Sequence, residues 1–232
     1  MNRTLGTLAI VSSLISTPAL HAQTVDPSGH WNGSIEIQGT PMRFEVDLAR
    51  DRRGDLGGTI SVPSQQLRGL PILKITATGQ SIAFFARSDQ TLTADLASDG
   101  RSMSGSYTVE GTPFPFTMTR TGDAQIDPPL TSAAISKELE GTWKTQTVTG
   151  TRLELRLTNQ PDGRATGRLV NVDQGGLEIP LAITQNASNV SLEAKVVPGS
   201  FTGILSADAA ELVGQWTQAS GIIPLTLRRS GK

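Results

Sequence analysis

The chain repeats itself at a nearly constant spacing. Pro71 and Pro180 are 180 − 71 = 109 positions apart. The same offset relates further pairs of identical residues, which are Gly58 and Gly167, Gln65 and Gln174, Asp99 and Asp208, Gly105 and Gly214, Pro115 and Pro224, and Arg120 and Arg229. An offset that holds through turns and strands alike indicates a tandem repeat, in which one folding unit is written twice.

The offset changes in two places. Near the start of each copy it is 143 − 31 = 112, which aligns the segment GHW with the segment GTW and predicts a shorter first hairpin in the second copy. Around Ile75 it is 183 − 75 = 108. We therefore expect copy 1 over residues 29–122, a linker over residues 123–139, and copy 2 over residues 140–231. In the linker, Pro128 and Pro129 disfavour regular structure, while residues 132–139 have the pattern of one or two helical turns.

Each copy has the residue pattern of short strands joined by tight turns. Phe44, Val46 and Leu48 alternate with polar residues, and the segment TRLELRLTN alternates in the same way, so each strand has one apolar face and one polar face. The 24 glycines and 13 prolines suit frequent turns. The fold class predicted is all-β, with two tandem antiparallel meander β-barrels of about eight strands each. Closure into barrels removes the sheet edges that would otherwise promote aggregation.

The N-terminus has the pattern of a secretory signal peptide. Arg3 is followed by an apolar run over residues 5–20 and by small residues that end at Ala22. We expect residues 1–22 to be a signal peptide that is cleaved after Ala22. The alternative, a permanent membrane anchor, is disfavoured because the run is short and is interrupted by Pro18.

Composition and charge narrow the compartment and the partners. The chain contains no cysteine, which excludes disulfides and a lipid-bearing cysteine. Without Arg3 the formal charge is 19 − 21 = −2, and the charges are interspersed, so we expect no nucleic-acid partner. No later segment has the length of a membrane span. The mature protein is predicted to be periplasmic or extracellular.

The usual residues of exported hydrolases are missing. His30 is the one histidine that remains after cleavage, which is too few for a zinc site. The sequence has no Gly-x-Ser-x-Gly elbow, no Ser-x-x-Lys motif and no cysteine nucleophile. A hydrolase that uses carboxylates stays open as a weak alternative, because Asp and Glu residues could form a pair. We predict no enzyme activity, no catalytic residues, no metal site and no cofactor.

Large rings occupy corresponding positions of the two copies and are the first candidates for ligand binding. Trp31 and Trp143 lie at the start of each copy, while Tyr107 and Trp216 lie near the end. In a closed meander the first and seventh strands come together, so these rings are expected to meet, where they would either fill the end of the barrel or line a pocket.

Two glutamines are further candidates. Gln65 and Gln174 lie in corresponding turns, and an amide side chain there can either bind nearby backbone groups or recognise a polar ligand.

Copy 2 resembles the β-rich accessory domain that precedes the catalytic domain in many exported bacterial α/β-hydrolases and serine β-lactamase-like hydrolases. The residues that match its pattern are Trp143, Asp173, Gln174, Gly175, Pro180, Leu181, Gly214, Gln215, Trp216, Gln218, Pro224 and Leu225. Copy 1 matches more loosely, through Trp31, Asn32, Gly33, Gln65, Pro71, Ile72, Asp99, Gly100, Gly105, Ser106 and Tyr107. It departs at Val109 and Glu110, where the family has a glutamine. Because no hydrolase domain follows copy 2 in this sequence, the resemblance implies an accessory role without catalytic residues.

Two functions follow from this pattern. The first is a non-catalytic exported binding or interaction module whose partner is a protein. The alternative is a carrier of a small apolar ligand, because lipocalins and avidin also begin their barrels with a Gly-x-Trp segment and share this general architecture.

Overall fold

The computed structural model describes residues 25–37, 39–87, 90–109 and 111–230. The predicted signal peptide, residues 1–22, and its cleavage site at Ala22 lie outside these residues. The described chain is almost entirely β-strand, and its helical element is the short 3-10 turn Pro63–Gln65. No helix in the described part of the chain is long and apolar enough to cross a membrane.

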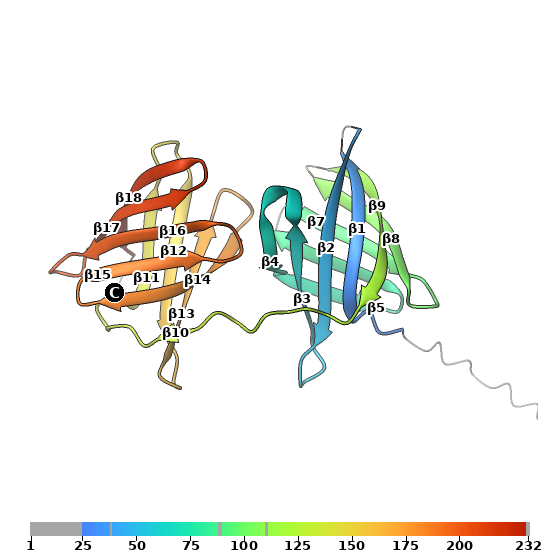
Figure 1. Ribbon diagram of the computed structural model, residues 1–232, viewed down its shortest axis with the longest axis horizontal. Coiled ribbons are helices and arrows are strands. Elements are labelled where there is room, and N and C mark those ends of the chain that lie inside the picture. Colours follow the sequence, from blue (N-terminus) through green and yellow to red (C-terminus); the bar gives the residue numbers. More distant parts are fainter. Residues whose placement is uncertain (1–24, 38, 88–89, 110, 231–232) are drawn as a thin grey trace, which may run out of the picture.

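Copy 1 forms one antiparallel sheet of nine strands that curls on itself (Figure 1). Its strand order is β4-β3-β2-β1-β9-β8-β7-β6-β5, so the first strand of the copy pairs with its last. The strands are β1 (Gly29–Ile37), β2 (Thr40–Arg50), β3 (Leu56–Val62), β4 (Leu67–Pro71), β5 (Lys74–Thr78), β6 (Ser81–Arg87), β7 (Gln90–Leu96), β8 (Ser102–Val109) and β9 (Thr112–Gly122).

Copy 2 forms a closed antiparallel barrel of eight strands. The strands are β11 (Gly141–Gln146), β12 (Arg152–Asn159), β13 (Arg164–Asn171), β14 (Leu177–Asn186), β15 (Asn189–Ala194), β16 (Gly199–Leu205), β17 (Glu211–Gln218) and β18 (Gly221–Arg229). The pairing of β13 with β14 and of β11 with β18 completes the ring. A short extra strand, β10 (Ser132–Ala133), pairs with β13.

The two copies differ where copy 1 breaks one strand into two. By position, β4 and β5 together correspond to the single strand β14. At the break, Ile72 N–H donates to Gly58 O at 2.9 Å and Leu73 N–H donates to Phe85 O at 2.9 Å, so this turn links β3 to β6. The prediction of two tandem all-β antiparallel barrels is confirmed, with copy 2 fully closed and copy 1 a curled sheet joined at this turn.

Each copy has its own hydrophobic core. In copy 1 the buried side chains include Trp31, Phe44 and Phe116. The rings of Phe44 and Phe116 pack edge to face, with their centroids 5.7 Å apart. In copy 2 they include Trp143 and Phe201. The apolar positions of the alternating strands point inward in both copies, as their period of two predicts.

The copies also contact each other. Arg68 N–H, on the outer edge of β4, donates to Val196 O in the turn after β15 at 2.9 Å. Strand β4 also lies against β14 (Figure 1). This contact covers part of an edge strand, which otherwise presents unpaired backbone groups.

Over residues 132–139, where one or two helical turns were predicted, the linker has an extended start followed by a single turn. Ser132 and Ala133 are extended because they pair with Ala165 and Arg164 of β13. The remaining turn is a single one, in which Leu139 N–H donates to Ser136 O at 3.0 Å.

Two corresponding glycines allow neighbouring strands to approach closely. A Cβ atom on Gly105 would lie 1.9 Å from Thr93 O, and one on Gly214 would lie 2.1 Å from Thr202 O. No side chain fits at these distances, so both positions require glycine.

We expect Gly105→Ala to lower the free energy of unfolding by about 1 to 3 kcal/mol, because the added methyl group forces β7 and β8 apart. Gly57→Ala is the matched control, since a Cβ atom there meets nothing within 4 Å. Urea unfolding followed by circular dichroism measures both variants. Equal stability of the two variants would contradict the close approach of these strands.

Candidate functional site

Trp31 and Trp143 lie inside the two cores, and both rings are 0% exposed. Trp31 Nε1–H donates to Pro27 O at 2.9 Å, and Trp143 Nε1–H donates to Leu139 O at 3.0 Å. Each acceptor lies four residues before its ring, so each indole holds the residues that lead into its barrel. We call these residues, 25–28 in copy 1 and 132–140 in copy 2, the lead-in segments. These two rings therefore present no surface to a ligand outside the core.

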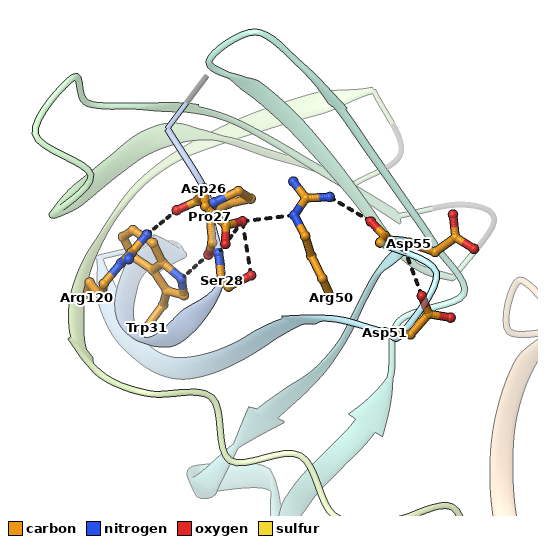
Figure 2. Close-up of polar contacts among 9 residues, drawn as sticks. Asp26, Pro27, Ser28, Trp31, Arg50, Asp51, Asp55 and Arg120 are labelled. Atoms are coloured by element: carbon orange, nitrogen blue, oxygen red, sulfur yellow. Dashed lines mark hydrogen bonds and ion pairs between the residues drawn. The ribbon is translucent and has the colours of Figure 1, made fainter. Parts of the chain in front are cut away.

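An arginine of the last strand packs on each of these rings. In copy 1 the Arg120 guanidinium lies 4.9 Å from the Trp31 ring centroid, and its Nη2 donates to Asp26 O at 2.5 Å (Figure 2). Trp31 and Arg120 are direct neighbours across β1 and β9. We call this pair, and its counterpart in copy 2, the tryptophan–arginine clamp. It joins the first strand, the last strand and the lead-in segment.

The clamp of copy 2 makes more hydrogen bonds. The Arg229 guanidinium lies 4.3 Å from the Trp143 ring centroid. It donates to Ala209 O at 2.9 Å, to Glu140 O at 2.6 Å and to Glu138 O. A cation on an indole face combines electrostatic attraction with apolar contact, and charged donors make the stronger hydrogen bonds.

The lead-in segment of copy 1 is also held by the carboxylate of Asp26 (Figure 2). This carboxylate accepts hydrogen bonds from Ser28 N–H at 3.3 Å, Ser28 Oγ at 3.1 Å and Arg50 Nε at 3.1 Å. Desolvation raises the pKa of Asp26, but the hydrogen bonds from Ser28 and Arg50 and the charge of Arg50 outweigh it, so the pKa lies below its ordinary value.

The predicted meeting of the rings does not occur, because the strand register keeps them apart. Trp31 is level with Arg120, whereas Tyr107 pairs with Phe114, six residues further along β9. At about 3.3 Å per residue this separates the two rings by roughly 20 Å along the barrel.

The same separation holds in copy 2. Trp143 pairs with Arg229, whereas Trp216 pairs with Ile223, six residues away along β18. Trp216 is 7% exposed, and its Nε1–H donates to Gln218 Oε1 at 3.0 Å. Tyr107 is half-buried and packs against the core of copy 1. Both rings fill the end of the barrel opposite the clamp.

The two glutamines lie in exposed turns. Gln65 belongs to the 3-10 turn, and its Nε2 lies 3.6 Å from Met42 Sδ. Gln174 N–H donates to Asn171 O at 3.3 Å, and Gln174 O accepts from Leu177 N–H at 3.2 Å. The structure does not bring the six predicted ligand-binding residues together into one site.

His30 has a structural partner that the sequence did not indicate. Its Nδ1 lies 2.8 Å from Asp47 Oδ1, and Asp47 is only 5% exposed. The same oxygen accepts Gln125 N–H at 2.8 Å, which ties the linker to copy 1. Among the described residues, no group of three His, Cys, Asp or Glu side chains is placed to hold a metal ion.

Two grooves lie on the outer faces of the barrels. The groove of copy 2 has a volume of about 620 Å³ and crosses β14, β15, β16 and β17. Its lining is uncharged and combines hydroxyl and amide side chains with Ile204 and Val213, which are 57% and 48% exposed. Ile204 and Val213 are direct cross-strand neighbours and form an aliphatic pair beside Gly214.

Copy 1 has a groove of about 360 Å³ at the corresponding place, over β5, β6, β7 and β8. Every lining residue of one groove has its counterpart in the other, at an offset of 184 − 76 = 108 or 202 − 93 = 109. Gly105 and Gly214, where neighbouring strands approach closely, are among the residues that line the grooves. Copy 1 differs in chemistry, because Asp95 and Ser104 replace the aliphatic pair. We call these two surfaces the outer grooves.

We expect Arg229→Ala to lower the free energy of unfolding of copy 2 by about 2 to 4 kcal/mol, because it leaves carbonyl groups beside Trp143 without a donor. Arg228→Ala is the matched control, since this neighbouring side chain is 75% exposed, and we expect a change within about 0.5 kcal/mol. Thermal unfolding measures both. Similar losses for the two variants would contradict a stabilising clamp.

A second expectation concerns how the stability of copy 1 depends on pH through Asp26. Because the folded pKa of Asp26 is lowered, its contribution is complete above the ordinary value of 3.8 and is lost as the pH falls through the folded pKa. The stability difference between the wild type and Asp26→Asn should therefore be constant above about pH 5 and shrink below it. Urea unfolding at a series of pH values measures this difference, and a difference independent of pH would contradict it.

Comparison with known proteins gives few matches. No family model matches the chain, and no curated protein matches it in sequence. Among solved structures, a protein of unknown function from the DUF3598 family of Nostoc punctiforme is 13% identical with a TM-score of 0.26, and the alignment covers 88% of this chain and 96% of that one.

Two further solved structures have similar values. A putative outer membrane protein of Bacteroides fragilis is 11% identical with a TM-score of 0.26, and 90% of this chain and 99% of that one are covered. The structure of MucB in complex with MucA(peri) is 11% identical with a TM-score of 0.21, and 90% of this chain and 91% of that one are covered. Similarity at this level assigns the chain to no family.

Proposed function

We propose that the mature protein is an exported, non-catalytic binding module that uses the outer faces of its two barrels to contact another protein. The observation that carries this proposal is the correspondence of the two outer grooves, residue by residue, between the copies. The groove of copy 2 is the primary contact, because it is larger and has an exposed aliphatic pair, Ile204 and Val213.

The chemistry of this groove favours an uncharged protein surface as its occupant. Thr202 and Gln215 supply hydroxyl and amide groups beside the aliphatic pair, and the lining contains no charged residue. Such a mixture is typical of contacts between proteins that also exist apart, where apolar contact is combined with neutral hydrogen bonds.

The compartment proposed is the periplasm or the outside of the cell. The support is the signal-peptide pattern of residues 1–22 and the composition of the remaining chain. The resemblance to accessory domains of exported hydrolases supports the same assignment. We include in the proposal that the chain has an accessory role of this kind, next to an enzyme rather than as one.

The carrier alternative requires rings that face an open lumen. Trp31 and Trp143 are fully buried and packed among aliphatic side chains, and the described grooves lie on the outside. We therefore place binding on the outer faces.

The test is affinity capture from periplasmic extract with three forms of the mature chain. The double variant Ile204→Asp with Val213→Ser gives copy 2 the groove residues that copy 1 has at these positions, Asp95 and Ser104, so it changes the surface without new strain. Val148→Asp is the matched control, because Val148 is 86% exposed and lies far from the groove, in the turn after β11.

We expect the wild type and Val148→Asp to recover the same protein, and the double variant to lose at least about nine-tenths of it, because a buried carboxylate without a partner is costly. Retention by the double variant would remove the groove from the proposal. Recovery of no partner under varied salt and detergent conditions, or turnover of ester, lactam or glycoside substrates, would contradict the proposed function.

A further inference from the structure

Copy 2 closes one end of its barrel with its own lead-in strand. At this end β13 and β14 diverge, and β10 fills the fork between them. Ser132 and Ala133 pair with β13, and Ser132 Oγ accepts Ile183 N–H of β14 at 2.7 Å. Two residues on, Ile135 enters the core and is 7% exposed.

Side-chain hydrogen bonds fix this lead-in strand further. Asn159 Oδ1 accepts Ile135 N–H at 2.9 Å, and Asn159 Nδ2 donates to Ile135 O at 3.0 Å. Gln185 Oε1 accepts Ser136 N–H at 2.8 Å. A four-residue extended segment therefore satisfies the backbone and the apolar surface of the fork.

Copy 1 has the same fork without a strand in it. The last bridge between its two sides is the hydrogen bond from Ile72 N–H to Gly58 O. Beyond it, residues 56–57 of β3 and the whole of β5 (Lys74–Thr78) have no strand between them among the described residues, and β5 is an edge of the sheet. We call this position the strand slot.

The apolar side chains around the fork are more exposed in copy 1, where no described strand fills it, than in copy 2. Ile183 of copy 2 is 6% exposed under β10, whereas its counterpart Ile75 is half-buried. Ala165 is 0% exposed, whereas its counterpart Leu56 is half-buried. Leu73, beside the slot, is 43% exposed. The strand slot thus combines a free backbone edge with accessible aliphatic groups.

The free edge of β5 points its donors into the slot. The β5–β6 hairpin has a two-residue turn, Gly79 and Gln80, so its closing pair Thr78 and Ser81 is hydrogen-bonded. Hydrogen-bonded and non-bonded pairs alternate in an antiparallel ladder, and Ile75 and Ala77 therefore direct their N–H and C=O groups away from β6. In copy 2 the counterpart of Ile75 is Ile183, and its N–H group points away from β15 and donates to Ser132 Oγ.

The counterpart of β10 in copy 1 falls within the predicted signal peptide. Ser132 lies 143 − 132 = 11 residues before Trp143. Trp31 corresponds to Trp143, so the counterpart of Ser132 is residue 31 − 11 = 20, which is Leu20. Leu20 lies outside the described residues and within the predicted signal peptide, so cleavage after Ala22 removes it. Residues 125–129 of the linker are exposed and form no strand.

We propose that the strand slot of copy 1 binds an extended segment of a partner protein, which adds a strand between β3 and β5 as β10 does in copy 2. The segment pairs with the backbone of Ile75 and Ala77 and places an apolar side chain on Leu56 and Ile75. This inference rests on the proposed binding role but uses a different surface from the outer grooves. Strand addition of this kind takes affinity from backbone hydrogen bonds and specificity from alternate side chains.

Recognition in copy 1 depends on the backbone more than in copy 2. The counterpart of Asn159 is Arg50, which is bound to Asp26 and Gly54, and the counterpart of Gln185 is Ala77. The side-chain anchors of β10 are therefore missing, and we expect reversible binding that a partner can leave.

The experiment uses the mature chain, residues 23–232, and a synthetic peptide of residues 130–137, LTSAAISK. Titration followed by NMR, together with amide hydrogen exchange, locates and quantifies binding. We expect protection of the Ile75 and Ala77 amides. A peptide with Ile135→Asp should bind at least about tenfold more weakly, because it loses the apolar contact.

Two protein variants share one position. Ala77→Pro removes the N–H group that faces the slot and leaves the β5–β6 ladder intact, so it should abolish binding. Ala77→Val keeps this N–H group and should bind as the wild type does. Absence of binding at millimolar peptide, equal affinity of Ala77→Pro, or protection confined to copy 2 would overturn the inference. If Ala77→Pro still captures the partner in extract while the double groove variant does not, the proposed function stands without the strand slot.

Discussion

Each barrel depends on one buried contact, the packing of an arginine on a tryptophan across the seam between its first and last strands. In a meander these strands are the furthest apart in sequence, so their meeting has the largest loop-closure cost. Trp31 and Arg120 are 120 − 31 = 89 residues apart and yet are direct strand neighbours. The indole supplies apolar burial, and the guanidinium binds carbonyl groups of the lead-in segment. The same contact therefore fixes both the seam and the path by which the chain enters the barrel.

The residues before the tryptophan are held differently in the two copies. In copy 2 the residues before Trp143 are long enough to form β10 and then to pass under the ring. In copy 1 the residues described before Trp31 are held by Arg120, which donates to Asp26 O. The broken strand, β4 and β5, has no strand like β10 beside it among the described residues. Part of its edge is covered by copy 2 through Arg68 and Val196, which makes the contact between the copies a partial substitute.

The sequence predicts the fold well and the candidate site poorly, for physical reasons. Alternation and the repeated offset are local or self-consistent signals, so they predict the strands and the two tandem barrels. The position of a ring along a barrel depends on the register between neighbouring strands, which cannot be derived from the residue pattern alone. This is why Trp31 and Tyr107 were expected to meet and instead lie at opposite ends. The helical pattern of residues 132–139 failed because pairing with β13 outweighs local propensity.

Gly105 and Gly214 are fixed by the backbone geometry of the barrels, whereas the exposed side chains of the outer grooves can vary. Gly105 and Gly214 are required because a Cβ atom at either position would lie less than 3 Å from backbone atoms of the neighbouring strand, so the close approach beside the groove is part of the fold itself. The exposed side chains beside that groove, such as Ile204 and Val213, carry no such constraint, because they point to solvent. Ile204 and Asp95 occupy the same place in two barrels of the same shape. Two barrels of this kind therefore keep one geometry and present two chemistries on their outer faces.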